Sequence, residues 1–233
     1  MAADESRAPR LRIHPLKNVE FRLEGSKEAR PFRVANLSAS GIGILKDPAT
    51  DPTFVWPPIG QSLKGAIATR NQAVAVTVEI VHSHLAVVGG RFLDNLTAIS
   101  AFVSKWFRTE LKAVRLTEVN AAVLKKPPRG TARWFQDGSG NELYWVAIDG
   151  KIDYFRVVFM GNIVERLSTG ALRTGMVESE DRDGLEYKGS ELVRDVPGVP
   201  KGMREAAISF VENVRGLEPE WKAQIVSPLE TPG

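Results

Sequence analysis

The sequence predicts a mainly β, α+β protein made of two successive parts, each a set of antiparallel strands followed by a helix. Short apolar runs with alternating polar residues occupy 18–94 and again 132–179. Apolar residues recur at helical spacing after each set, near 99–114 and 203–214. A chain of 233 residues that is 43% hydrophobic can bury two cores of modest size, which favours two domains.

The overall composition excludes several classes of protein. The 31 basic and 28 acidic residues leave a net charge of only +3, which argues against a polybasic nucleic-acid binder. The chain has no cysteine, so it has no disulfide framework, cysteine zinc site or thiol nucleophile. It shows neither a signal-peptide core nor an apolar run long enough to span a bilayer. We therefore expect a cytoplasmic protein without membrane insertion.

The first half is expected to contain an arginine-rich arm at 1–15 and a β-domain with a closing helix at 16–112. Val74, Val76 and Val78 alternate with small or polar residues, as in a strand with one buried face. Several such runs, separated by Gly, Pro, Asp and Asn, predict a small antiparallel barrel or sandwich. An apolar stripe from Ile99 to Val114 predicts the helix.

The second half is expected to begin after a linker at 113–130, where the run KKPPRG suits an exposed connection. Residues 131–233 then predict an antiparallel meander of four or five strands, joined by turn dipeptides such as DG and GN, with one helix near 203–214. A further hairpin is possible around DRDGLEYKGSELV. If Tyr144 and Val146 face inward, Trp145 faces outward as a candidate for partner binding.

One polar cluster interrupts the apolar run VANLSASGIGILKD at 34–47. Asn36, Ser38 and Gly41 form the pattern N-x-S-x-x-G, whose side chains offer donors and acceptors to a planar ligand while glycine permits close approach. An isolated pattern of this kind can also serve only to cap a strand or satisfy a bulge. The arginines that precede the first strand, in SRAPRLRI, change its context: Arg7, Arg10 and Arg12.

An arginine-rich entry, the N-x-S-x-x-G strand, the strand ending GGRFLD and the closing helix together resemble the PilZ domain family over residues 7 to about 108. The resemblance implies a six-stranded antiparallel barrel with a C-terminal helix, and cyclic di-GMP as the ligand. Family members carry R-x-x-x-R before the first strand and (D/N)-x-S-x-x-G on the barrel. The second motif is complete here. The first is displaced, with Arg12 matching its second arginine and Arg7 or Arg10 standing in for the first.

The resemblance implies a cyclic di-GMP receptor or adaptor that acts on a partner in motility or in surface polysaccharide regulation. The ligand-binding residues it implies are Arg7, Arg10, Arg12, Asn36, Ser38 and Gly41. The displaced arginines leave open a degenerate domain that binds no nucleotide and serves as a protein interaction module. Its partner surface would then include the aromatic second half.

Other chemistry has little support in the sequence. His82 and His84 alone are too few for a predicted metal site. The chain has no nucleophile motif and no paired acid and base, so we expect no catalytic residues, no enzymatic activity and no cofactor.

Overall fold

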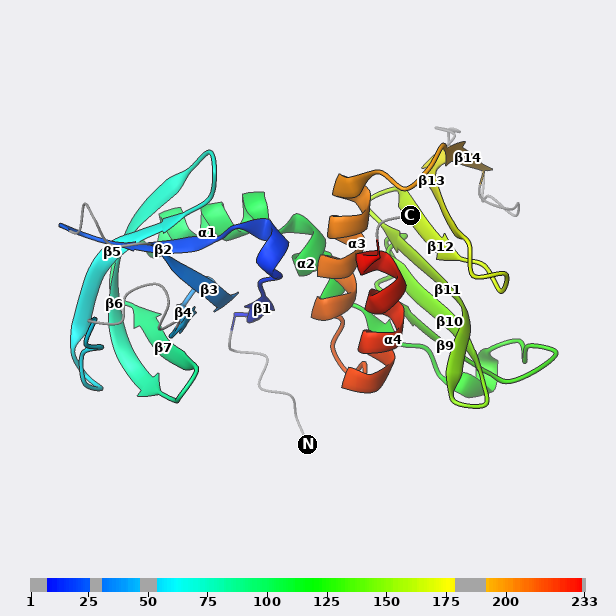
Figure 1. Ribbon diagram of the computed structural model, residues 1–233, viewed down its shortest axis with the longest axis horizontal. Helices are drawn as coiled ribbons and strands as arrows, with labels where there is room; N and C mark the ends of the chain where they lie inside the picture. The colour runs from blue at the N-terminus through cyan, green and yellow to red at the C-terminus, as the bar shows by residue number, and fades with distance from the viewer. Residues whose placement is uncertain (1–7, 26–30, 47–53, 179–191, 232–233) are drawn as a thin grey trace. The chain divides into compact units, whose positions relative to one another are not determined.

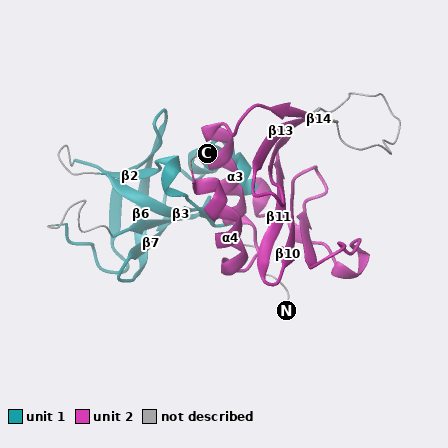
Figure 2. Ribbon diagram, turned by 45° about the vertical axis from the view of Figure 1, so that its right-hand side comes forward, with its two compact units in different colours: residues 1–111 teal, residues 112–233 magenta. Residues whose placement is uncertain are grey.

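The chain folds into two compact units, residues 1–111 and 112–233 (Figure 2). They are seen in a computed structural model that describes residues 8–25, 31–46, 54–178 and 192–231. The hairpin expected around DRDGLEYKGSELV lies almost wholly outside the described residues. None of the helices in these described ranges is long and apolar enough to cross a bilayer.

The first unit is a closed antiparallel barrel of six strands, as expected (Figure 1). The sheet closes because β3 pairs with both β2 and β4. A further short strand, β1 (Leu11–Arg12), pairs with the end of β3. The barrel strands are β2 (Glu20–Leu23), β3 (Phe32–Leu37), β4 (Gly41–Leu45), β5 (Ser62–Ala68), β6 (Ala73–Ser83) and β7 (Val87–Phe92).

Alternation along the strands fills the barrel. Val74, Val76 and Val78 of β6 are buried, whereas the residues between them face outward. The closing helix α1 (Leu96–Trp106) adds its own apolar stripe to this core. The stripe expected to continue to residue 114 is interrupted at Phe107, and a separate short helix, α2 (Arg108–Ala113), follows.

An ion pair joins the chain after β1 to these helices. The 3-10 turn η1 (Pro15–Lys17) places Nζ of Lys17 2.5 Å from Oε1 of Glu110, whose side chain is completely buried. The same ammonium group donates a hydrogen bond of 3.4 Å to the carbonyl of Trp106 and lies over the Phe107 ring. A buried carboxylate needs such compensation, because removing it from water is costly.

The second unit is an antiparallel meander, and the seven strands of its described residues lie in the sheet in chain order. This is more than the four or five expected, because short strands are added at both ends. The segment 113–130 contains one of them, and its Ala113 and Leu116 belong to the core of this unit. The strands are β8 (Thr117–Glu118), β9 (Thr131–Gln136), β10 (Glu142–Ile148), β11 (Lys151–Phe159), β12 (Asn162–Arg166), β13 (Leu172–Glu178) and β14 (Leu192–Val196).

Two helices, α3 (Lys201–Asn213) and α4 (Pro219–Glu230), cover one face of this sheet (Figure 1). The sequence indicated only the first, although Pro219 at the first helical position is a recognised start signal. The alternative in which Tyr144 faces inward and Trp145 outward is wrong. Trp145 is 1% exposed and stacks on Phe135 beneath the helices, while Tyr144 lies on the helix-free face.

We expect Lys17→Met to destabilise the first unit by about 2 kcal/mol, because it leaves the buried carboxylate of Glu110 without its ammonium partner. The double variant Lys17→Met/Glu110→Leu should recover most of that loss, since it removes the charge as well. Hydrogen exchange of barrel amides measures the change, with amides of the second unit as the internal control. Unchanged exchange in the single variant would contradict a stabilising role for the pair.

Candidate functional site

Five residues on neighbouring strands lie opposite one another across the outer surface of the barrel. Arg12 on β1 is opposite Asn36 on β3, which is opposite Gly43 on β4. Gly43 is in turn opposite Gly89 on β7, and Gly89 is opposite His82 on β6. Residues paired in this way point to the same face of a sheet. We refer to these five residues as the cross-strand row.

Two β-bulges place the polar members of the row on the outer face. In β3, Val34 is buried, so strict alternation would also send Asn36 inward, but the register shifts between them. In β6, Ile80 is buried, and a second shift precedes His82. An extra residue in one strand reverses which face the following side chain occupies. Both polar side chains therefore leave the barrel core.

The two glycines make room for these side chains to lie across the neighbouring strands. A Cβ on Gly43 would overlap the carboxamide of Asn36, and one on Gly89 would overlap the imidazole of His82. Asn36 and His82 thus lie flat over backbone instead of projecting from it. The result is a low surface that a planar group can approach closely.

Asn36 carries an unsatisfied hydrogen-bond acceptor within the row. Its Oδ1 atom is buried and has no hydrogen-bond partner. An unsatisfied buried acceptor costs about 1–3 kcal/mol, so a native protein rarely keeps one without a reason. A ligand N–H group donated at this point would satisfy it.

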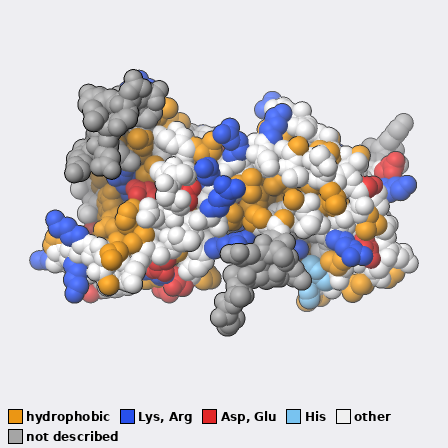
Figure 3. Space-filling view, turned by 180° about the vertical axis from the view of Figure 1, so that it is seen from behind, with side chains coloured by type: hydrophobic (Ala, Val, Ile, Leu, Met, Phe, Trp, Pro, Cys, Tyr) orange, Lys and Arg blue, Asp and Glu red, His pale blue; other side chains and the backbone are white. Residues whose placement is uncertain are grey.

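The strands of the row are electropositive. Together β1, β3, β4, β6 and β7 contain the arginines Arg12, Arg33 and Arg91 but one carboxylate, Glu79, which is ion-paired with Arg91. Figure 3 shows histidine side chains near lysine and arginine side chains on one face of the molecule. This balance favours an anionic ligand.

The pKa of the His82 imidazole is lowered by the groups around it. The His82 ring centre is 5.4 Å from that of His84, which lies just after the end of β6. Burial, His84 and the positive charge of Arg10 all lower the pKa of His82. The charge of Arg10, just before β1, therefore acts on this imidazole.

The predicted site residues divide into two groups. Arg12 and Asn36 come together at the row, Arg10 immediately precedes β1 and acts on His82, and Arg7 lies outside the described residues. Ser38 and Gly41 instead build the turn from β3 to β4.

In that turn the Ser38 hydroxyl accepts a hydrogen bond of 3.1 Å from the Gly41 amide and one of 3.3 Å from the Ser40 amide. A Cβ on Gly41 would lie 2.6 Å from the carbonyl oxygen of Gly90, so glycine there lets β4 approach β7. These contacts give Ser38 and Gly41 a role in the fold itself.

Gly43 and Gly89 were not among the residues expected at the site, and His82 was considered only as a metal ligand. The repeated glycines in GIG and GG were the available signal, because glycine inside a strand often marks a bulge or a close approach. Nothing in the sequence shows that the strands bearing them are neighbours.

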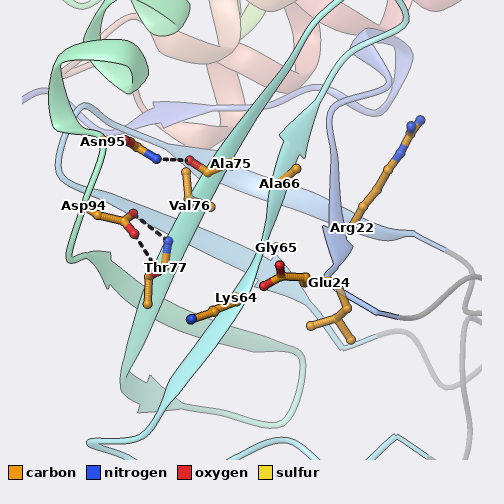
Figure 4. Close-up of a pocket in the computed structure, with 11 residues that line it drawn as sticks. Arg22, Glu24, Lys64, Gly65, Ala66, Ala75, Val76, Thr77, Asp94 and Asn95 are labelled. Atoms are coloured by element: carbon orange, nitrogen blue, oxygen red, sulfur yellow. Dashed lines mark hydrogen bonds between the residues drawn. The ribbon is translucent and has the colours of Figure 1, made fainter.

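A separate groove of about 460 Å³ lies over β2, β5 and β6 (Figure 4). Its basic side chains, Arg22 and Lys64, are balanced by Glu24 and Asp94. Asp94 accepts hydrogen bonds of 2.7 Å and 2.6 Å from the amide and hydroxyl of Thr77, and these bonds lower its pKa. The groove thus has neither the charge excess nor the unpaired acceptor of the row.

The helix-free face of the second unit carries a polar network. Tyr154 donates a hydrogen bond of 3.0 Å to Glu165, and Trp134 donates one of 3.0 Å to Glu142. Arg156 lies 3.4 Å from Glu142 and 3.8 Å from Glu165. Burial and the neighbouring Glu165 raise the pKa of Tyr154 well above its usual value. These groups largely satisfy one another.

Comparisons with known proteins add little to this picture. No protein-family model matches the chain, and no curated protein matches it. Among solved structures, the Legionella uncharacterized protein Lpg0364 matches with a TM-score of 0.33 and 16% sequence identity, over 44% of this chain and 97% of that one.

We expect Gly41→Ala to destabilise the first unit by about 1–3 kcal/mol, because the new methyl group meets backbone that cannot rotate away. Gly202→Ala is the matched control. A Cβ there meets nothing within 4 Å, and alanine in a helix should gain about 0.5–1 kcal/mol. Urea unfolding measures both. A Gly41→Ala protein as stable as the parent would contradict the proposed close approach of β4 and β7.

Proposed function

We propose that the barrel is a receptor for cyclic di-GMP and that the nucleotide binds across the cross-strand row. The observation that carries the proposal is the buried, unpaired Oδ1 of Asn36, which lies opposite Arg12 on a surface with an excess of arginine. The resemblance to the PilZ family supplies the identity of the nucleotide.

The chemistry of the row suits that ligand. Cyclic di-GMP carries two phosphodiesters and two guanines. The guanidinium groups of Arg10 and Arg12 can each bond a phosphate in bidentate fashion, bond O6 and N7 of guanine, or stack on its face. Oδ1 of Asn36 can accept from a guanine N–H group, and the low surface over Gly43 and Gly89 leaves space for a base.

A continuous segment leads from this site toward the rest of the chain. Arg12 ends β1, and η1 follows three residues later with Lys17 bound to Glu110 of α2. The second unit begins at Lys112, within that same helix. We propose that ordering of the arginine arm on the nucleotide acts through this segment on a protein partner in motility or surface regulation.

A nucleotide-independent interaction module is the second candidate. It is favoured by the structural roles of Ser38 and Gly41, because these would preserve N-x-S-x-x-G even if no ligand bound. The partner surface in that case is the helix-free face of the second unit. Trp134, Tyr144 and Tyr154 are half-buried there, and such aromatic residues are common at protein interfaces.

Calorimetric titration with cyclic di-GMP separates the two candidates. We expect saturable binding to the full chain, weakened roughly tenfold to a hundredfold by Arg12→Ala or Asn36→Ala, since each removes a contact worth about 1–3 kcal/mol. Arg22→Ala is the matched control. It removes an exposed barrel arginine that is paired with Glu20 and lies outside the row, and should leave affinity unchanged.

Absence of binding heat and of any thermal shift at high ligand concentration would exclude the receptor and favour the interaction module. Binding lost in Arg22→Ala but kept in Arg12→Ala would move the site to the groove of Figure 4.

A further inference from the structure

We propose that His82 is a ligand-contacting residue of the row, and that its protonated imidazole pairs with a phosphate of the bound nucleotide and makes binding stronger at mildly acidic pH. This inference rests on the proposed cyclic di-GMP site.

The position of His82 sets it apart from an ordinary strand histidine. A bulge after Ile80 turns it out of the core, and Gly89 opposite gives its ring space to lie over the backbone. Four register pairs connect it to Arg12 through Asn36 and the two glycines. A ligand that reaches from the arginine arm across Asn36 and over the glycines therefore meets the imidazole at the far end.

The charged groups around His82 are almost all cationic. Arg10 acts on it from the arm, and His84 lies just beyond the end of β6. From the end of β4, Nζ of Lys46 donates a 2.7 Å hydrogen bond to the hydroxyl of Ser83.

Arg91 on β7 belongs to the same outer face, where it is ion-paired with Glu79 of β6. Glu79 is the one carboxylate on the five strands of the row, and it is already engaged. In the free protein, the five strands therefore offer no carboxylate to a protonated His82 other than Glu79, which is already paired with Arg91.

The direction of the pH effect follows from this arrangement. Burial, His84 and Arg10 hold the pKa of His82 below its usual 6.5 in the free protein. A phosphate beside the ring favours the charged form and raises that pKa in the complex. Between the two pKa values, binding takes up a proton, so affinity rises as pH falls, by at most about tenfold per pH unit for one group. The phosphodiesters stay ionised throughout this range, so the ligand does not contribute the effect.

The test is calorimetry of the full chain with cyclic di-GMP at about pH 8 and about pH 6, each in two buffers of different ionisation enthalpy. We expect tighter binding at the lower pH and uptake of up to one proton for each nucleotide bound. His82→Gln should lose the uptake while still binding at the higher pH. His84→Gln is the matched control and should keep the uptake.

Gly89→Ala provides a second variant, because its methyl group must push the imidazole off the row without removing it. We expect it to lose the proton uptake as well. The imidazole NMR signals of the three histidines in the unaltered protein should show a ligand-induced rise in the pKa of His82 alone, which requires no substitution.

No binding at either pH would refute the receptor itself. Binding with the same affinity at both pH values and no proton uptake would leave the receptor standing and overturn the role of His82. Uptake that disappears only in His84→Gln would likewise overturn it.

Discussion

The pairing of β3 with three other strands is the constraint on which the first unit depends. Its first two residues pair with β2 and its stretch from Val34 to Leu37 pairs with β4, which closes the barrel, while Asn36 and Leu37 also pair with β1. The same strand thus completes the core and brings the arginine arm beside Asn36. Asn36 and Leu37 are paired on both sides, with β1 and with β4, so the position of Asn36 is determined by two neighbouring strands.

The candidate site is made by local departures from regular strand structure. Without the bulges after Val34 and Ile80, Asn36 and His82 would point into an apolar core, where polar groups without partners are costly. Bulges re-aim single side chains while the rest of the ladder continues, and they are frequent at functional sites. The unpaired oxygen of Asn36 is the remaining energetic cost of this arrangement, and a bound donor would remove it.

The second unit is organised differently, because its strands pair only with sequence neighbours. Its stability depends on α3 and α4, which cover one face of the sheet. Arg133 links an early strand of this unit to its last helix. That guanidinium group lies 2.6 Å from Glu118 of β8 and 2.6 Å from Glu218 at the start of α4, over the rings of Phe135 and Trp145. It joins the edge strand, the sheet and the last helix. On the opposite face of the sheet, no helix of the described residues covers the aromatic side chains.

Alternation and helical spacing predicted the antiparallel strands of both units and the helices α1 and α3, but not α4. The resemblance supplied the six-stranded barrel, and a short motif singled out Asn36 as a candidate. These features are local, because each follows from alternation, turn residues or a short motif within a few positions of the chain.

The face of the sheet to which a given side chain points is not a local property. Trp145 and Tyr144 alternate equally well in either sense, and only the helices packed on the sheet decide that Trp145 is buried. Likewise the sequence contains His82, Gly89, Gly43 and Arg12 far apart and without a common motif. Only closure of the barrel, with its two bulges, places them in one row beside Asn36, because strand register is set by pairing across the whole sheet.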